Sequence, residues 1–231
     1  MPELTSVEWE AVTLSLKVAF WSVLASLPPG IAVAWLLARR DFPGKMLLNA
    51  LVHLPLILPP VVTGYILLVL FGTRGPIGAW MRESLGIVVA FRWTGAAIAA
   101  AVMGFPLLVR AIRLSIEAVD RRLEASAGTL GAPPLAVFAT VTLPLVFPGI
   151  IAGTILAFAK GLGEFGATIT FVSNIPGETR TLPIAIYTFL QVPGEEQAVL
   201  RLTGIAIVIS FLALVASELL ARRVTRGTGP T

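Results

Sequence analysis

The sequence predicts an all-α membrane protein, a polytopic bundle of about five transmembrane helices. Hydrophobic residues make up 56% of the 231 residues before the 21 glycines are counted, and only 13% are charged. Five stretches are also long and apolar enough to cross a bilayer, which takes about 20 residues. This composition excludes intrinsic disorder. Because the sequence contains no cysteine, it also excludes a disulfide framework and a thiolate metal site.

The predicted spans form a single transmembrane domain over residues 1–231. They cover residues 11–38, 46–71, 93–109, 146–172 and 198–220. A further apolar stretch, 182–191, is interpreted as a short helix before the last span. It lies either outside the membrane or dips into it.

The basic residues predict the orientation of the chain. Ten lie in one set of loops: Arg39, Arg40, Lys45, Arg110, Arg113, Arg121, Arg122, Arg222, Arg223 and Arg226. Only five lie in the opposite set: Arg74, Arg82, Arg92, Arg180 and Arg201. Loops rich in Lys and Arg stay in the cytoplasm, so we expect the N-terminus outside and the C-terminus inside. Membrane topology then explains the excess of basic residues in the sequence. We expect no nucleic-acid partner, because no basic patch is interleaved with aromatic residues.

The loop 110–144 is the longest predicted cytoplasmic segment. Apolar residues first recur at helical spacing in Ile112, Ile116, Val119, Leu123 and Ala127, and Gly131 and Pro133-Pro134 then break the pattern. The segment is either a connector helix on the membrane surface or a docking element whose apolar face enters a groove on a partner.

The second half of this loop resembles the EAA loop of permease subunits of binding-protein-dependent ABC importers. That signature is Glu-Ala-Ala, three residues, Gly, nine residues, Ile, one residue, Leu-Pro. The spacing from Gly131 to Leu143-Pro144 is intact, Val141 replaces Ile, and the acidic residue Glu124 stands one place early. The resemblance implies a MetI-like permease fold and a coupling helix that contacts an ATPase. The residues that it assigns to this contact are Glu124, Ala125, Ser126, Ala127, Gly131, Ala132, Val141, Leu143 and Pro144.

The sequence has no nucleotide-binding loop of the G-x-x-x-x-G-K-[ST] type, since its Gly44-Lys45 pair is followed by Met46. We therefore expect no catalytic residue, metal or cofactor in this chain. ATP would be used by a separate ATPase.

Two charged residues fall inside the fourth span. Lys160 and Glu164 are four residues apart, so they share a helix face and can pair. Charges within spans usually face a bundle interior or a water-filled path. The two residues therefore either line a translocation pathway or form a structural ion pair, and the spacing alone favours neither.

A hydroxyl-rich stretch follows, including Thr168, Thr170 and Ser173. Such donors suit a hydrated oxyanion that must pass without tight binding. The same side chains could instead cap helices and build turns.

The stretch 161–183 closely resembles the molybdate permeases of this importer class. Residues 53–65 and 105–113 resemble them as well, so the similarity extends over the whole chain. It implies import of a tetrahedral oxyanion, with molybdate as the first candidate, across the inner (plasma) membrane of a bacterium. Sulfate and tungstate permeases of the same family are the alternatives, because all three ions are tetrahedral dianions.

The resemblance also implies a complex. Two copies of this chain would form a homodimer in the lipid bilayer, with two cytoplasmic ATPase subunits and one periplasmic oxyanion-binding protein. An ion-coupled secondary transporter is a weaker alternative, because such transporters normally show internal repeats and broken helices.

Overall fold

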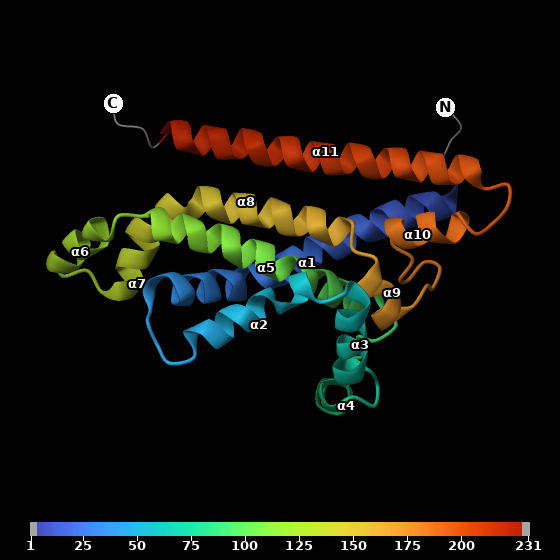
Figure 1. The fold of residues 1–231 in the computed structure, drawn as a ribbon, viewed down its shortest axis with the longest axis horizontal. Helices are drawn as coiled ribbons and strands as arrows, with labels where there is room; N and C mark the ends of the chain where they lie inside the picture. Colours follow the sequence, from blue (N-terminus) through green and yellow to red (C-terminus); the bar gives the residue numbers. More distant parts are fainter. Residues whose placement is uncertain (1–3, 228–231) are drawn as a thin grey trace.

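The computed structural model describes residues 4–227, with side chains of the last helix described through Ala216 and at Leu219. Four long helices run side by side along the molecule (Figure 1): α1 (Ser6–Arg39), α5 (Trp93–Ala118), α8 (Leu143–Leu162) and α11 (Glu196–Gly227). Each is apolar enough to span a membrane over much of its length, and α2 (Lys45–Ile57) with α3 (Pro60–Phe71) forms a bent pair that could add a fifth span. The predicted all-α class is confirmed for the described residues.

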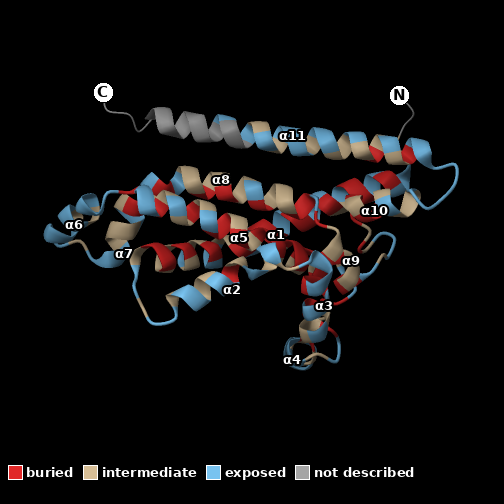
Figure 2. Cartoon of the chain, viewed as in Figure 1, coloured by how far each residue is buried: buried red, intermediate tan, exposed pale blue. Residues whose placement is uncertain are grey.

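Helix α5 lies at the centre of the bundle, between α1 and α8. Figure 2 shows its buried residues in red, in contrast to the largely exposed α11. Its first half buries mainly small residues, among them Ala96, Ala99 and Ala100, and its second half buries Leu108, Ile112 and Ile116. Small residues let helix backbones approach closely, which is how helices associate in lipid.

The second predicted span, 46–71, is not one straight helix. Helix α2 ends at Ile57, α3 begins at Pro60, and their axes differ by 114°. Leu58 and Pro59 both have extended backbone conformations. Because proline disfavours the α conformation in the preceding residue and lacks an N–H, the Pro59-Pro60 pair ends the helix here.

The helices observed at the third and fourth predicted spans begin or end at other residues than predicted. Helix α5 continues to Ala118, so the first nine residues of the predicted loop 110–144 belong to a bundle helix. The fourth span begins earlier than predicted, because helical structure is continuous over Pro134–Leu162. It then breaks at 163–165 before the short helix α9 (Gly166–Val172). The predicted spans 11–38 and 198–220 lie within α1 and α11, although the side chains of Arg222, Arg223 and Arg226 lie outside the described residues.

Helix α3 leaves the bundle sideways and leads to α4 (Pro76–Leu85), as Figure 1 shows. It crosses α9 at two glycines. A Cβ on Gly64 would lie 2.5 Å from the carbonyl oxygen of Ala167, and one on Gly166 would lie 2.7 Å from Cβ of Pro60. The two helices can therefore cross this closely only because both residues are glycines.

The substitution Gly64→Ala should destabilise the protein, because its new methyl group meets backbone atoms of α9 that cannot rotate away. Overpacking of this kind costs about 1–3 kcal/mol. Thermal unfolding of the purified protein in detergent measures the effect. Gly204→Ala in α11 is the matched control, because a Cβ there meets nothing within 4 Å. Equal melting temperatures for the two variants would contradict the close crossing.

Two polar contacts hold helices together at the end of the bundle where α9 and α10 (Leu182–Phe189) lie. The buried carboxylate of Glu8 pairs with Arg201 at 2.8 Å and joins α1 to α11. The backbone N–H of Leu182 donates to the hydroxyl of Ser15 at 2.6 Å. Since Ser15 is inside the predicted span 11–38, α10 packs beside the first turns of α1 rather than beyond them.

Candidate functional site

The segment between α5 and α8 forms a compact cap on one end of the bundle, here called the α6–α7 end (Figure 1). Its first helix, α6 (Arg121–Thr129), begins where the Asp120 carboxylate accepts a hydrogen bond from the N–H of Arg122 at 2.9 Å. No described residue of α6 is buried. Apolar packing therefore contributes little to its attachment.

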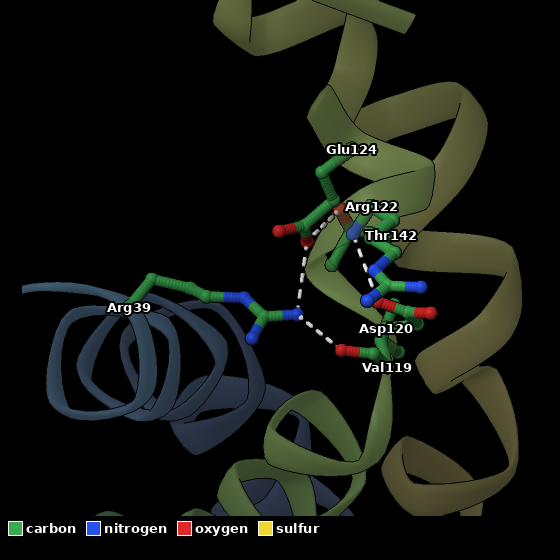
Figure 3. A network of polar contacts seen from close by, with 6 residues as sticks. All are labelled: Arg39, Val119, Asp120, Arg122, Glu124 and Thr142. Carbon is green, nitrogen blue, oxygen red and sulfur yellow. Dashed lines mark hydrogen bonds and ion pairs between the residues drawn. The ribbon is translucent and has the colours of Figure 1, made fainter. Parts of the chain in front are cut away.

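An ion pair supplies that attachment (Figure 3). Glu124 of α6 accepts a hydrogen bond from Arg39 at the end of α1, at 3.1 Å, and another from the hydroxyl of Thr142 at 2.7 Å. The same Arg39 nitrogen donates to the carbonyl oxygen of Val119 at 3.2 Å. The Arg39 side chain is only 8% exposed and that of Glu124 is 20% exposed, so water screens this pair weakly. One carboxylate thus joins α6, α1 and the start of α8.

Thr142 reaches Glu124 from a π-helical turn. Short helix α7 (Pro134–Val137) passes into the π segment Phe138–Thr142 (η1), which continues without a break into α8. The N–H of Leu143 donates to the carbonyl of Phe138, five residues back. In a regular α-helix the ring of Pro144 would clash with the carbonyl four residues earlier, and the wider π turn relieves this clash. The Leu-Pro of the signature therefore directly follows the widened turn.

Gly131 ends α6 in a left-handed conformation, with φ of +86°. Its N–H donates to the carbonyl of Gly128, and the N–H of Ala132 donates to that of Ala127. On either side of this turn, Leu130 is 88% exposed and Leu135 is 84% exposed. Two large apolar side chains thus project from the tip of the cap.

Seven of the nine predicted coupling residues lie in this cap, and the other two, Leu143 and Pro144, begin α8. Glu124 holds the ion pair, and the hydroxyl of Ser126 donates to the carbonyl of Arg122. Ala125 and Ala132 line a cavity of about 410 Å³ beneath α6. Val141 and Leu143 are half-buried, whereas Pro144 is exposed. The contact that these residues are expected to make with an ATPase stays a prediction.

The helix break between α8 and α9 holds the second predicted group. The Lys160 ammonium lies 2.6 Å from a carboxylate oxygen of Glu164, whose side chain is only 1% exposed, whereas that of Lys160 is 30% exposed. The other Glu164 oxygen accepts the N–H of Ala167 at 3.0 Å, in the first turn of α9. The pair therefore spans the break and carries no net charge.

The predicted hydroxyl residues near this break differ in their surroundings. The Thr170 hydroxyl donates to the carbonyl of Gly166 at 2.8 Å, and Thr168 is buried. Ser173 ends α9 with φ of +65°, and its carbonyl accepts the hydroxyl of Thr179 at 3.0 Å. Lys160, Glu164, Thr168 and Thr170 thus gather at the break, while Ser173 lies at the far end of α9. A role for these five residues in a translocation pathway stays a prediction.

Residues 30–226 match the family described as binding-protein-dependent transport system inner membrane component. The chain belongs to this permease family. Its relatives include the molybdenum transport system permease protein of Escherichia coli K12, 61% identical over 95% of this chain and 96% of that protein. The Haemophilus influenzae protein of the same name is 53% identical over 96% of this chain and 97% of that protein.

The fold of the chain is also that of solved permeases. It is similar to a chain of the inward-facing MetNI methionine ABC transporter, with a TM-score of 0.68 and 14% sequence identity. The alignment covers 94% of each chain. The predicted MetI-like architecture is therefore confirmed, and the protein is a multi-pass membrane permease.

Two residues of this permease that the sequence reasoning missed are Arg39 and Thr142. Arg39 was counted only as a basic residue after the first span, although a charge at a helix end beside a loop with an unpaired Glu is a signal for pairing. Thr142 stands between Val141 and Leu143, in the middle of the signature, and no spacing rule identifies its hydroxyl as a donor.

In this permease, Gly131→Val should reduce ATP-driven uptake by the assembled importer. A Cβ at Gly131 meets nothing within 4 Å, so the cost comes from the positive φ and is about 1–2 kcal/mol. Gly131→Asn should retain uptake because Asn tolerates this conformation. Gly128→Ala, three residues earlier in equally open space, is the control. Uptake is measured per amount of permease in the membrane, and full activity of Gly131→Val would exclude a role for this turn.

Proposed function

We propose that the chain is the membrane-spanning subunit of an ATP-driven importer that moves molybdate into the bacterial cytoplasm. The observation that carries this proposal is the 61% identity, over 95% of the chain, to a molybdenum transport permease. In this proposal the protein lies in the inner membrane with its N-terminus outside and its C-terminus in the cytoplasm. Two copies form the pathway together, one external oxyanion-binding protein delivers the ion, and two ATPase subunits bind on the cytoplasmic side.

The cap at the α6–α7 end would be the contact with the ATPase. Leu130 and Leu135 offer two exposed apolar anchors at its tip, as suits insertion into a groove. Movement of the cap would reach α1 through the ion pair between Glu124 and Arg39. It would reach α8 both through Thr142 and through the continuous helix Pro134–Leu162.

That helix leads from the cap to the Lys160–Glu164 break at the other end of the bundle. A helix of 29 residues is about 44 Å long, enough to cross the hydrocarbon core of a bilayer. ATP binding and hydrolysis by the partner would therefore move the break without any chemistry in this chain. A neutral pair and a locally bonded Thr170 hydroxyl at the break would let a dianion pass without holding it.

Uptake by the purified importer in proteoliposomes tests this proposal. The permease, its ATPase and its binding protein are reconstituted, and uptake of labelled molybdate is measured with and without ATP. We expect uptake that requires ATP and that excess sulfate inhibits weakly. Stronger competition by sulfate or by tungstate than by unlabelled molybdate would assign the importer to that ion instead. Uptake driven by a proton or sodium gradient in the absence of ATP would overturn the ABC mechanism in favour of a secondary transporter.

A further inference from the structure

The cavity at the α6–α7 end has a basic wall. It is lined by Arg39 and Arg40 of α1's end, by Arg121 of α6 and by Glu124. Because Glu124 offsets only one of the three arginines, the wall carries net positive charge. The nearby Asp41 carboxylate also interacts with Arg121, but it pairs with Lys45 at 2.8 Å, so the charges of Asp41 and Lys45 cancel and the wall stays basic. A cavity of this charge favours an anionic ligand.

One buried donor in this wall has no partner. Arg39 uses a terminal nitrogen for Glu124 and Val119, but its Nε is buried and makes no hydrogen bond within the described part of the chain. A buried donor without an acceptor is costly, about 1–3 kcal/mol. An anionic oxygen entering the cavity would supply an acceptor.

The remaining wall is apolar and suits more than a small inorganic ion. Trp35, Pro134, Val137 and Phe138 line the same cavity of about 410 Å³, which is several times larger than a tetrahedral oxyanion. The guanidinium of Arg40 lies over the Trp35 ring, 5.4 Å from its centroid. Trp beside Arg at the end of a membrane helix is typical of the headgroup layer.

The length of α1 agrees with that depth. Its 34 residues extend about 51 Å, against a hydrocarbon core of about 30 Å, so the helix end at Arg39 reaches the headgroup region. Basic pockets between transmembrane helices bind anionic lipid headgroups in this layer.

We propose that this cavity binds an anionic phospholipid, with the phosphate among Arg39, Arg40 and Arg121 and the glycerol against Val137 and Phe138. The headgroup would link α1 to α6 and α7, the segments that Glu124 already joins. Bound lipid would therefore stiffen the attachment of the cap. This inference does not depend on which ion the permease carries.

Lipid binding to the purified full-length permease in neutral detergent tests the site. Dioctanoyl phosphatidylglycerol is titrated, and bound lipid is counted by native mass spectrometry. The double substitution Arg40→Gln/Arg121→Gln should weaken binding about 30-fold, because each basic residue near the headgroup contributes about a fivefold factor. Arg40→Lys/Arg121→Lys should retain most of the affinity, because the charge remains.

Arg74→Gln/Arg82→Gln is the matched control, since it removes two exposed arginines from the α3–α4 region instead. It should leave the affinity unchanged. Unchanged binding by Arg40→Gln/Arg121→Gln would overturn the proposal, as would equally tight binding of dioctanoyl phosphatidylcholine. If inorganic phosphate displaced the lipid at comparable concentration, the cavity would be a free-oxyanion site. If the ATPase subunit displaced it fully, the cavity would be part of that contact. Either result would also overturn the lipid proposal.

Discussion

Lys160→Met should destabilise the folded permease strongly, because it leaves the Glu164 carboxylate in a site where that side chain is 1% exposed. Breaking a buried ion pair by removing one partner costs about 3–5 kcal/mol. Thermal unfolding in detergent and the amount of protein in the membrane both measure the loss. Lys17→Met is the control: this lysine of α1 is exposed, its ammonium lies 3.8 Å from the centroid of the Trp93 ring, and losing that contact should cost only about 0.5–1 kcal/mol.

The double substitution Lys160→Met/Glu164→Gln separates the two interpretations of this pair. The Gln oxygen can still accept the N–H of Ala167, and no lone charge is left in the bundle. We therefore expect stability to recover. Recovery of uptake as well would make the pair structural, whereas a stable variant without uptake would give it a role in the pathway. Failure of the double variant to regain stability would contradict the pairing itself.

Glu124→Ala should uncouple the cap from the bundle. It removes the carboxylate that joins Arg39 and Thr142, and it leaves the 8% exposed Arg39 side chain without its counter-charge. We expect a loss of about 3 kcal/mol in stability. ATP-driven uptake should fall further than the amount of folded permease does, because α6 has no buried residue to hold it in place.

Milder substitutions in the same network should cause smaller losses of stability and uptake. Thr142→Val removes one hydrogen bond at nearly constant shape and should cost about 1 kcal/mol. Glu124→Gln keeps acceptors for both donors and should fall between these variants. Glu117→Ala, whose exposed pair with Arg113 lies on α5, is the control and should be close to wild type. Wild-type coupling in Glu124→Ala would show that the cap is held by other contacts.

Hydropathy and charge were enough to predict the bundle, because bilayer thickness fixes the length of an apolar helix. The Gly-to-Leu-Pro spacing was enough to place the cap, because Gly131 needs its positive φ and Pro144 needs a widened turn. Edges were harder. Ile112 and Ile116 are buried in the bundle like other span residues, so residues 110–118 extend the third span and do not belong to the predicted loop. The 114° bend after Ile57 was also missed, although Pro59-Pro60 is a recognisable helix-ending signal.

The polar partners could not be predicted from spacing. Arg39 and Glu124 are 85 residues apart, and only the packing of α1 beside α5 brings them together. In contrast, the i,i+4 pairing of Lys160 with Glu164 followed directly from helix geometry and is confirmed. What the sequence did not show is that Glu164 also caps α9, because the break at 163–165 exists only in the folded chain.

The π turn at Phe138–Thr142 has a consequence for the angular phase of the helix. One extra residue per turn rotates everything before it by about 100° around the helix axis relative to a regular α-helix. Leu135 at the tip and Ile150 in the core are therefore not in the register that simple counting gives. Deleting one residue from this turn would remove the widening that accommodates Pro144 and would rotate the segment before it by about 100° around the helix axis. A permease aligned with a one-residue gap here would aim its cap in a different direction.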